Sequence, residues 1–195
     1  MEWRLSVRHG SNRTGFTLLE LLFTLFTISI LLGLALPGFQ QLHRNTEMDI
    51  HARGLAQLLQ LARVAAITRN SLVTLCRSVD GEGCSGQWED GILVFVDYDG
   101  DRKIDSNDEV VRYHQFFGFD GEIDWRAFQN RQYLQITSTG FTRYQNGNFT
   151  LCPADGNLTY ARQLIVNRSA RVRFAQDSNA DGIREDSQGR PLSCS

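Results

Sequence analysis

The chain has 195 residues, of which 42% are hydrophobic, and its formal net charge at neutral pH is -2. This length accommodates one domain of ordinary size beside a shorter segment, because soluble domains cluster at about 100 to 150 residues. The weak negative charge excludes a protein held to nucleic acid by overall basicity. Lys103 is the only lysine, so arginine carries almost all of the positive charge.

An apolar run near the N-terminus predicts a membrane-spanning helix. From Phe16 to Phe39 there are 24 residues with a single charge, Glu20. At about 1.5 Å per residue such a helix reaches roughly 36 Å, which crosses a bilayer. Three arginines precede the run, so the positive-inside rule keeps the first residues cytoplasmic and places the rest of the chain across the membrane. Ala35 and Gly38, near the end of the run, fit an ordinary signal-peptidase site only weakly, and cleavage there is the alternative.

The six residues from Gly15 to Glu20 read GFTLLE. This motif resembles the prepilin signature of type IV pilins and type II secretion pseudopilins. The resemblance implies cleavage between Gly15 and Phe16 and methylation of the new Phe16 amine by the same prepilin peptidase. That amine would neutralise Glu20 of a neighbouring subunit, since an unpaired charge in lipid costs about 2.5 to 3.5 kcal/mol. A contact within its own first turn, or an acid that snorkels to the membrane surface, is the alternative.

The helical pattern continues past the apolar run. Apolar residues recur every three or four positions and form one stripe, at Met48, Ala52, Leu55, Leu59, Ala62 and Ala66. A helix with such a stripe must bury it, and we expect the stripe to pack against a β-sheet. Pro37 removes a helical hydrogen bond, so we expect a kink or local melting between the apolar and amphipathic halves. We therefore expect one long, bent helix from Phe16 to about Arg69.

Beyond this helix the pattern changes to period two, or to short apolar runs separated by glycine, asparagine and aspartate. The strand candidates are LVTLC, GILVFVDYD, EVVRYHQF, YLQITSTG, FTLC, ARQLIVN and ARVRFAQD. We expect an antiparallel β-sheet domain packed on the helix, which makes the fold class α+β. With the prepilin signature this implies the pilin fold. Its expected parts are a cleaved leader at residues 1–15, a transmembrane and assembly helix at 16–41, and a periplasmic domain at 42–195.

The segment WEDGILVFVDYDGDRKIDSNDEVVR resembles the GspH and FimT/FimU branch of the pilin family. In that branch a tryptophan and a glycine precede an apolar strand, an acidic turn and a second strand. The matching positions are Trp88, Gly91, Phe95, Asp97, Asp99, Asp101 and Glu109. The segment RQLIVNRSARVRF resembles the terminal arginine-containing hairpin of the same branch. Major pilins generally lack the central pattern, so the resemblance points to a minor pilin or minor pseudopilin.

Four cysteines in a domain expected in an oxidising compartment favour disulfides over a metal site. They are Cys76, Cys84, Cys152 and Cys194. Sequence proximity favours Cys76 with Cys84 and Cys152 with Cys194, although three pairings are possible. Structural zinc is disfavoured, because no pair has the two-to-four-residue spacing of such sites.

Two acidic loops place oxygen ligands at alternating positions, as a calcium loop does. The first contains Asp97, Asp99, Asp101 and Asp105, and the second contains Asp177, Asn179 and Asp181 followed by Gly182. The first has Arg102 where an EF-hand has glycine, and the second has Gln188 where an EF-hand has its bidentate glutamate. Because Asp, Asn and Gly are also the favoured residues of turns, we expect both loops to be plain turns without a metal.

An arginine cluster near the C-terminus is the strongest signal for a ligand. Its members are Arg162, Arg168, Arg171 and Arg173, with no acid between them. The last two would face the same side of a strand, where a phosphate backbone could lie. FimT-type pilins used in DNA uptake carry a glycine, arginine, any residue, arginine motif here, and Ala170 replaces that glycine. A solvated strand face or a subunit contact is the favoured alternative, because the chain is acidic overall.

We expect neither an enzyme nor a cofactor, since no nucleophile, phosphate-loop or histidine-rich metal motif is present. The resemblance implies a minor pilin that helps to initiate a type IV pilus at or near its tip. A DNA-binding minor pilin for natural transformation and a minor pseudopilin of a type II secretion system are the alternatives. Implied partners are other minor and major pilins, the prepilin peptidase and the inner-membrane assembly platform. The chain would first span the inner membrane once, with a periplasmic domain, and later lie in an extracellular pilus.

Overall fold

The computed structural model describes residues 15–194 and has two compact units, one ending at Leu42 and one beginning at His43. A single helix, α1 (Leu18–Thr68), contributes to both. The prediction of one long helix is confirmed, and its bounds lie within two residues of the predicted ones. The helix continues through Pro37 without local melting, since a proline removes one hydrogen bond while the neighbouring turns keep theirs. The predicted leader, apart from Gly15, lies outside the described residues.

The first unit is an apolar helix whose large side chains are exposed. Three of its hydroxyl groups donate hydrogen bonds to the helix backbone. Thr24, Thr27 and Ser29 donate to main-chain carbonyls three or four residues earlier, at 2.7 to 3.1 Å. Such back-bonding hides hydroxyl groups from an apolar solvent. Among the described residues, α1 is the one helix long and apolar enough to span a membrane.

The second half of α1 supplies one wall of the hydrophobic core. The predicted apolar stripe is confirmed, because all of its members are at most 5% exposed: Met48, Ala52, Leu55, Leu59, Ala62 and Ala66. Leu58 and Ala65, which are 5% and 2% exposed, widen the buried face. The small alanine side chains let the helix lie close to the strands that cover it.

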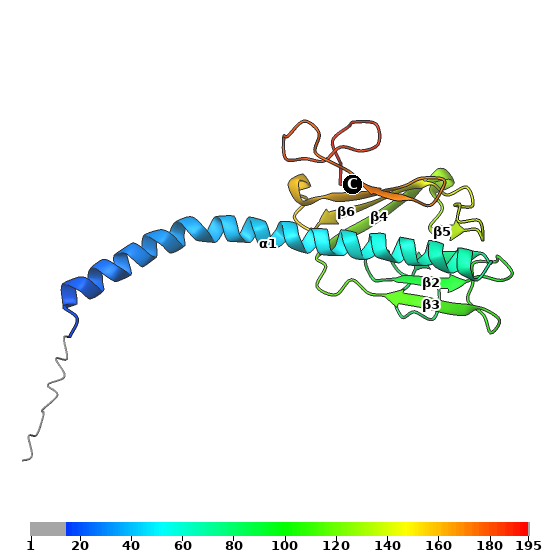
Figure 1. The fold of residues 1–195 in the computed structure, drawn as a ribbon, viewed down its shortest axis with the longest axis horizontal. Coiled ribbons are helices and arrows are strands. Elements are labelled where there is room, and N and C mark those ends of the chain that lie inside the picture. The colour runs from blue at the N-terminus through cyan, green and yellow to red at the C-terminus, as the bar shows by residue number, and fades with distance from the viewer. Residues whose placement is uncertain (1–14, 195) are drawn as a thin grey trace, which may run out of the picture. The chain divides into compact units, whose positions relative to one another are not determined.

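The second unit contains eight strands in two antiparallel sheets, several of which are labelled in Figure 1. They are β1 (Val73–Arg77), β2 (Ile92–Val96), β3 (Glu109–His114), β4 (Gly121–Ala127), β5 (Tyr133–Ile136), β6 (Gly147–Pro153), β7 (Arg162–Val166) and β8 (Val172–Phe174). The first sheet has the order β3-β2-β1-β5, and the second has the order β4-β6-β7-β8. Single-turn helices η1 (Phe128–Asn130) and η2 (Leu158–Tyr160) lie in the connections.

The strands form two hydrogen-bonded sheets where the sequence predicts one. Both sheets bury a face in the same core as the α1 stripe, so the helix covers them together. The additional strand is β4, whose buried residues are Ile123 and Trp125 and whose other side chains include charged groups. Its period-two alternation was visible in GEIDWRA, but only two of its positions are strongly apolar.

Three aromatic rings fill the centre of this core. Trp125 stacks on Phe149 with ring centroids 4.2 Å apart, and Trp88 meets Phe149 edge-on at 5.1 Å. The indole N–H of Trp88 donates to Gln132 at 3.0 Å. Both tryptophans therefore pack inside the domain, as the sequence predicts, and neither offers a platform for a ligand.

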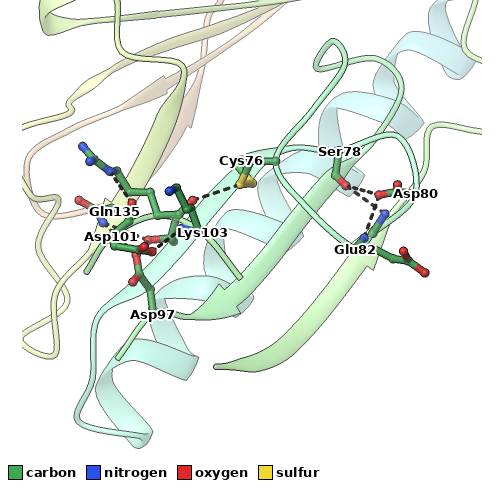
Figure 2. Close-up of a disulfide and its surroundings, with 12 residues drawn as sticks. Cys76, Ser78, Asp80, Glu82, Asp97, Asp101, Lys103 and Gln135 are labelled. Atoms are coloured by element: carbon green, nitrogen blue, oxygen red, sulfur yellow. Dashed lines mark hydrogen bonds between the residues drawn. A yellow bond between two sulfur atoms is a disulfide. The ribbon is translucent and has the colours of Figure 1, made fainter. Parts of the chain in front are cut away.

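Two disulfides close loops of different length, in the pairing that sequence proximity favours. Cys76 joins Cys84 across 8 residues, as Figure 2 shows, and Cys152 joins Cys194 across 42 residues. The second bond fixes the C-terminal tail to β6.

Replacing Cys152 and Cys194 by serine should lower the free energy of unfolding by about 3 to 4 kcal/mol, because the longer loop restricts the unfolded chain more. The matched change at Cys76 and Cys84 should lower it by only about 2.5 kcal/mol. Denaturant unfolding of residues 43–195 measures both losses. A larger loss for the short loop would contradict the loop-length argument.

Two histidines lie beside Phe116, with ring centroids 6.1 Å away for His51 and 4.8 Å away for His114. Burial lowers the pKa of His51, against an opposing effect of Glu47. Burial lowers the pKa of His114 as well, helped by the charges of Arg112 and His51. As the pH falls, these two histidines therefore become protonated at a higher pH in the unfolded chain than in the folded chain.

The domain should lose stability as the pH falls below the ordinary histidine value of 6.5, since protonation then favours the unfolded state. Replacing His51 and His114 by glutamine should flatten this part of the profile. A separate loss below about pH 4.5 should remain, because carboxylates such as Glu109 have pKa values lowered by hydrogen bonds from Arg69. Melting temperatures at closely spaced pH values measure both effects, and an unchanged slope near pH 6 in the double variant would refute the assignment.

Candidate functional site

The start of the apolar helix is the first candidate site. Gly15 and Phe16 precede α1, and 85% of the Phe16 surface is exposed. Thr17 caps the helix, because its hydroxyl accepts a hydrogen bond from the backbone N–H of Glu20 at 3.2 Å. The Glu20 side chain is exposed, and within residues 15–194 its carboxylate has no hydrogen-bond or ion-pair partner. A carboxylate in this position can accept a cation supplied by another molecule.

Large apolar side chains surround this carboxylate on the helix surface. All are more than half exposed: Leu18, Leu19, Leu21, Leu22, Phe23, Leu25 and Phe26. A contiguous apolar surface of this kind marks contact with lipid or with protein. Glu20 is thus one charge in a surface that must be removed from water.

The second candidate site is the predicted arginine cluster, and the structure removes Arg162 from it. The Arg162 side chain is 3% exposed. Its guanidinium donates to the Asp49 carboxylate at 2.5 Å, to the Asn45 side chain at 3.0 Å and to the Tyr160 carbonyl at 2.9 Å. These contacts join β7 to α1, so Arg162 is not available to a nucleic acid and does not belong with the possible DNA-binding residues among which the sequence placed it. The sequence hides this pairing because Asp49 lies 113 residues away.

Two backbone hydrogen bonds close the turn between β7 and β8, in which Ala170 stands where the resemblance implies glycine. The Ala170 N–H donates to the Asn167 carbonyl at 2.9 Å, and the Asn167 N–H donates to the Arg171 carbonyl at 3.1 Å. Ala170 has φ +52°, the left-handed conformation that favours glycine, and its side chain is buried. Three-residue hairpin loops commonly end on such a residue. Ala170 thus adopts, in the turn that presents the arginines, a backbone conformation that glycine favours.

The three remaining arginines lie exposed on this hairpin. Arg168 is in the turn, Arg171 follows it, and Arg173 is in β8 opposite Ile165. Within the described part of the chain, none of the three forms an ion pair. We call Arg168, Arg171 and Arg173 the basic hairpin. Its uncompensated guanidinium groups can bind phosphate or carboxylate groups.

The first acidic loop is a hydrogen-bonded turn in which Asp97 is fully buried (Figure 2). One Asp97 oxygen accepts from the Thr74 hydroxyl at 2.5 Å and from the Gln135 amide at 3.1 Å. The other accepts from the Gly100 N–H at 2.7 Å. Asp101 accepts from the Lys103 N–H at 2.7 Å. The buried carboxylate is thus held by protein donors and acts as a structural anchor between β1, β2 and β5.

The family described as Type II transport protein GspH matches residues 51–170, which is more than half of the chain. The chain belongs to the GspH family. A relative in Thermus thermophilus, "Pilin-like protein PilA1", is 39% identical over 102 residues, or 52% of this chain and 60% of the relative. The match thus spans less than two thirds of that protein. The solved type IV minor pilin FimU of Pseudomonas aeruginosa is 20% identical, covers 77% of this chain and 96% of its own, and gives a TM-score of 0.55. The FimU match shows a shared fold.

The family positions in the centre of this GspH chain have architectural roles. Gly91 has no room for a side chain, because a Cβ atom would lie 2.8 Å from the Ser78 carbonyl oxygen and 2.9 Å from that of His114. Glu109 accepts two hydrogen bonds from Arg69, at 2.7 and 3.1 Å, and so ties β3 to the end of α1. The central motif therefore builds the domain.

Proposed function

We propose that this chain is a minor pilin of a type IV pilus and helps to initiate the filament at or near its tip. The observation that carries the proposal is an apolar helix, containing the single carboxylate of Glu20, joined to a GspH-family domain. Such a surface needs lipid before assembly and the helices of other subunits after it. The pilin-like relative and the minor-pilin fold of FimU support the same conclusion.

In this proposal the leader ends at Gly15 and prepilin peptidase creates and methylates the amine of Phe16. Residues 16–41 first anchor the chain in the inner membrane, with residues 42–195 in the periplasm. The anchor then leaves lipid and packs with major and other minor pilins, guided by the inner-membrane assembly platform. Glu20 pairs with the terminal amine of a neighbouring subunit. The chain acts as a structural subunit without enzymatic activity.

Deleting the gene and counting surface pili by electron microscopy tests the proposal. We expect a large loss of pili, restored by the intact gene, because a filament that lacks its initiating subunits starts rarely. Normal pili together with a defect in protein secretion would instead support the minor pseudopilin of a type II secretion system. Normal pili and normal secretion would refute both roles.

DNA binding through the basic hairpin is a second candidate function. Three exposed arginines without ion pairs among the described residues favour it. The acidic overall charge favours the structural role alone. A duplex held by these arginines should bind without sequence preference, and each neutralised phosphate should add about 0.9 to the slope of log affinity against log salt.

A gel-shift assay on residues 43–195 at about 0.15 M salt decides this point, since weak nonspecific attraction is then largely screened. We expect no shift. A shift that disappears in Arg171→Gln with Arg173→Gln, and persists in the charge-matched Arg112→Gln with Arg126→Gln, would establish DNA binding. The first pair should then reduce the salt slope by up to about 2.

A further inference from the structure

The loop after β8 gathers three carboxylates. Oxygens of Asp177, Asp181 and Glu185 all lie within 4.8 Å of one another. The two aspartates are exposed, whereas Glu185 is only 7% exposed. Backbone bridges hold Glu185 between Gln176 on one side and Pro191 on the other. The loop thus folds back over a carboxylate that the backbone fixes in place.

One oxygen of the Glu185 carboxylate is buried without a partner. Its Oε2 accepts from both the N–H and the hydroxyl of Ser178, each at 2.8 Å. Its Oε1 is enclosed and has no hydrogen-bond partner among the described residues. No ion pair in this part of the chain includes Glu185 or either aspartate. A buried charge with neighbouring like charges is strongly unfavourable unless a cation compensates it.

We propose that Asp177, Asp181 and Glu185 bind a calcium ion. Carboxylate oxygens are hard ligands that suit calcium or magnesium. Calcium accepts an irregular set of six to eight oxygens, whereas magnesium demands a regular octahedron and keeps most of its water. The loop offers three carboxylates, two on exposed turns and one at a buried bridge position, whereas proteins usually bind magnesium through one or two. Water and the loop backbone complete the calcium shell.

The aspartates can serve as ligands while they keep their roles in the turn. Asp177 accepts from the N–H groups of Ala180 and Gly182 at 2.7 and 2.9 Å, and Asp181 accepts from that of Ile183 at 2.8 Å. Each carboxylate has about four lone-pair sites, so sites remain for a cation. These hydrogen bonds pre-order the ligands before the ion arrives.

The first acidic loop provides the contrast. Asp97, its buried carboxylate, has protein donors on both oxygens, whereas Glu185 has one enclosed oxygen without a partner among the described residues. The expectation of a plain turn stays a prediction for that loop, and the calcium proposal replaces it for the second loop. Counted from Asp177 as the first position of an EF-hand loop, the twelfth position is Gln188. The glutamate of this loop instead lies at the ninth position, Glu185. The alternation from Asp177 to Asp181 followed by this glutamate was the available signal.

Calcium titration of the full-length protein in detergent micelles, stripped of divalent ions with a chelator, tests the site. Calorimetry should show one saturable site with a dissociation constant of about 10⁻⁴ to 10⁻³ M, the range of extracellular modules. The melting temperature should rise by about 4 to 8 °C at ~10 mM CaCl₂. Magnesium chloride at the same concentration should have a much smaller effect.

Asp181→Asn should weaken calcium binding at least about tenfold and abolish the rise in melting temperature, because one charged ligand is lost. Its side chain is exposed, so the chelated variant should melt no lower than the chelated parent. Glu185→Gln should also lose the calcium response. Asp99→Asn with Asp101→Asn is the matched control in the first acidic loop and should retain it.

The proposal fails if the parent protein shows neither heat nor a change in melting temperature up to ~10 mM calcium. It also fails if Asp181→Asn keeps the full response, or if the control pair in the first loop loses it. An equal response to magnesium would overturn the assignment of calcium. Should Glu185→Gln not fold, the Asp181→Asn variant alone decides the result.

Discussion

Replacing Glu20 by alanine should leave the protein in the membrane and cleaved after Gly15, yet nearly absent from sheared filaments. The variant helix is more apolar, so insertion into lipid is easier. What is lost is the carboxylate that would meet the amine of Phe16 on a neighbouring subunit, a pairing made strong by the low dielectric of the helix surroundings. Immunoblots of sheared pili and of membrane fractions, normalised to total protein, measure the two pools separately.

The charge can be separated from the side-chain shape by two further variants. Glu20→Gln should behave like Glu20→Ala, because the amide keeps the shape and loses the charge. Thr24→Ala, one turn away on the same helix, should enter filaments normally, since the Thr24 hydroxyl only donates to the Leu21 carbonyl. Normal amounts of Glu20→Gln in sheared filaments would refute the pairing of Glu20 with the Phe16 amine of a neighbouring subunit.

Gly15→Glu should block an earlier step, leaving uncut precursor in the inner membrane. A bulky charge would then occupy the residue before the scissile bond. Mature-size protein in this variant would show that cleavage occurs elsewhere. Gly15→Glu thus tests maturation of the precursor, and Glu20→Ala tests assembly of the mature protein.

Much of the fold follows from short-range patterns in the sequence. The α1 stripe recurs at helical spacing, so Met48 and its partners could be assigned to the core before any strand was placed. The apolar strands around Val94 and Leu164 were equally visible, and the disulfide pairing followed from proximity along the chain. In each case the residues that decide the structure lie within a few positions of one another, or within one loop.

The remaining features depend on contacts between distant segments. The division into two sheets depends on which strand edges form hydrogen bonds with each other. The alternation of apolar and polar residues within β4 does not predict its partner strand. Likewise, Arg162 reads as one of four clustered arginines, and only its contact with Asp49 on α1 removes it from the surface. The exposed Arg171 and the buried Arg162 have the same chemistry and differ only in what the fold places around them.

The different environments of these arginines predict very different effects on stability. Arg162→Met should lower the free energy of unfolding by about 3 kcal/mol or more, because three groups lose a charged donor in a buried position: the Asp49 carboxylate, the Asn45 side chain and the Tyr160 carbonyl. Arg171→Met should change it by less than about 0.5 kcal/mol, since its side chain lies on the surface.

Combining Arg162→Met with Asp49→Leu distinguishes the ion pair from general packing. Each single change leaves the other partner unpaired, whereas the double change removes both charges, so the two losses should be non-additive by about 1 kcal/mol or more. Part of the loss should persist in the double variant, because the Tyr160 carbonyl still lacks its donor. Denaturant unfolding of residues 43–195 for the parent, both single variants and the double variant gives the coupling directly. Additive losses would mean that Arg162 stabilises the domain through its carbonyl contacts and its packing, with no specific contribution from Asp49.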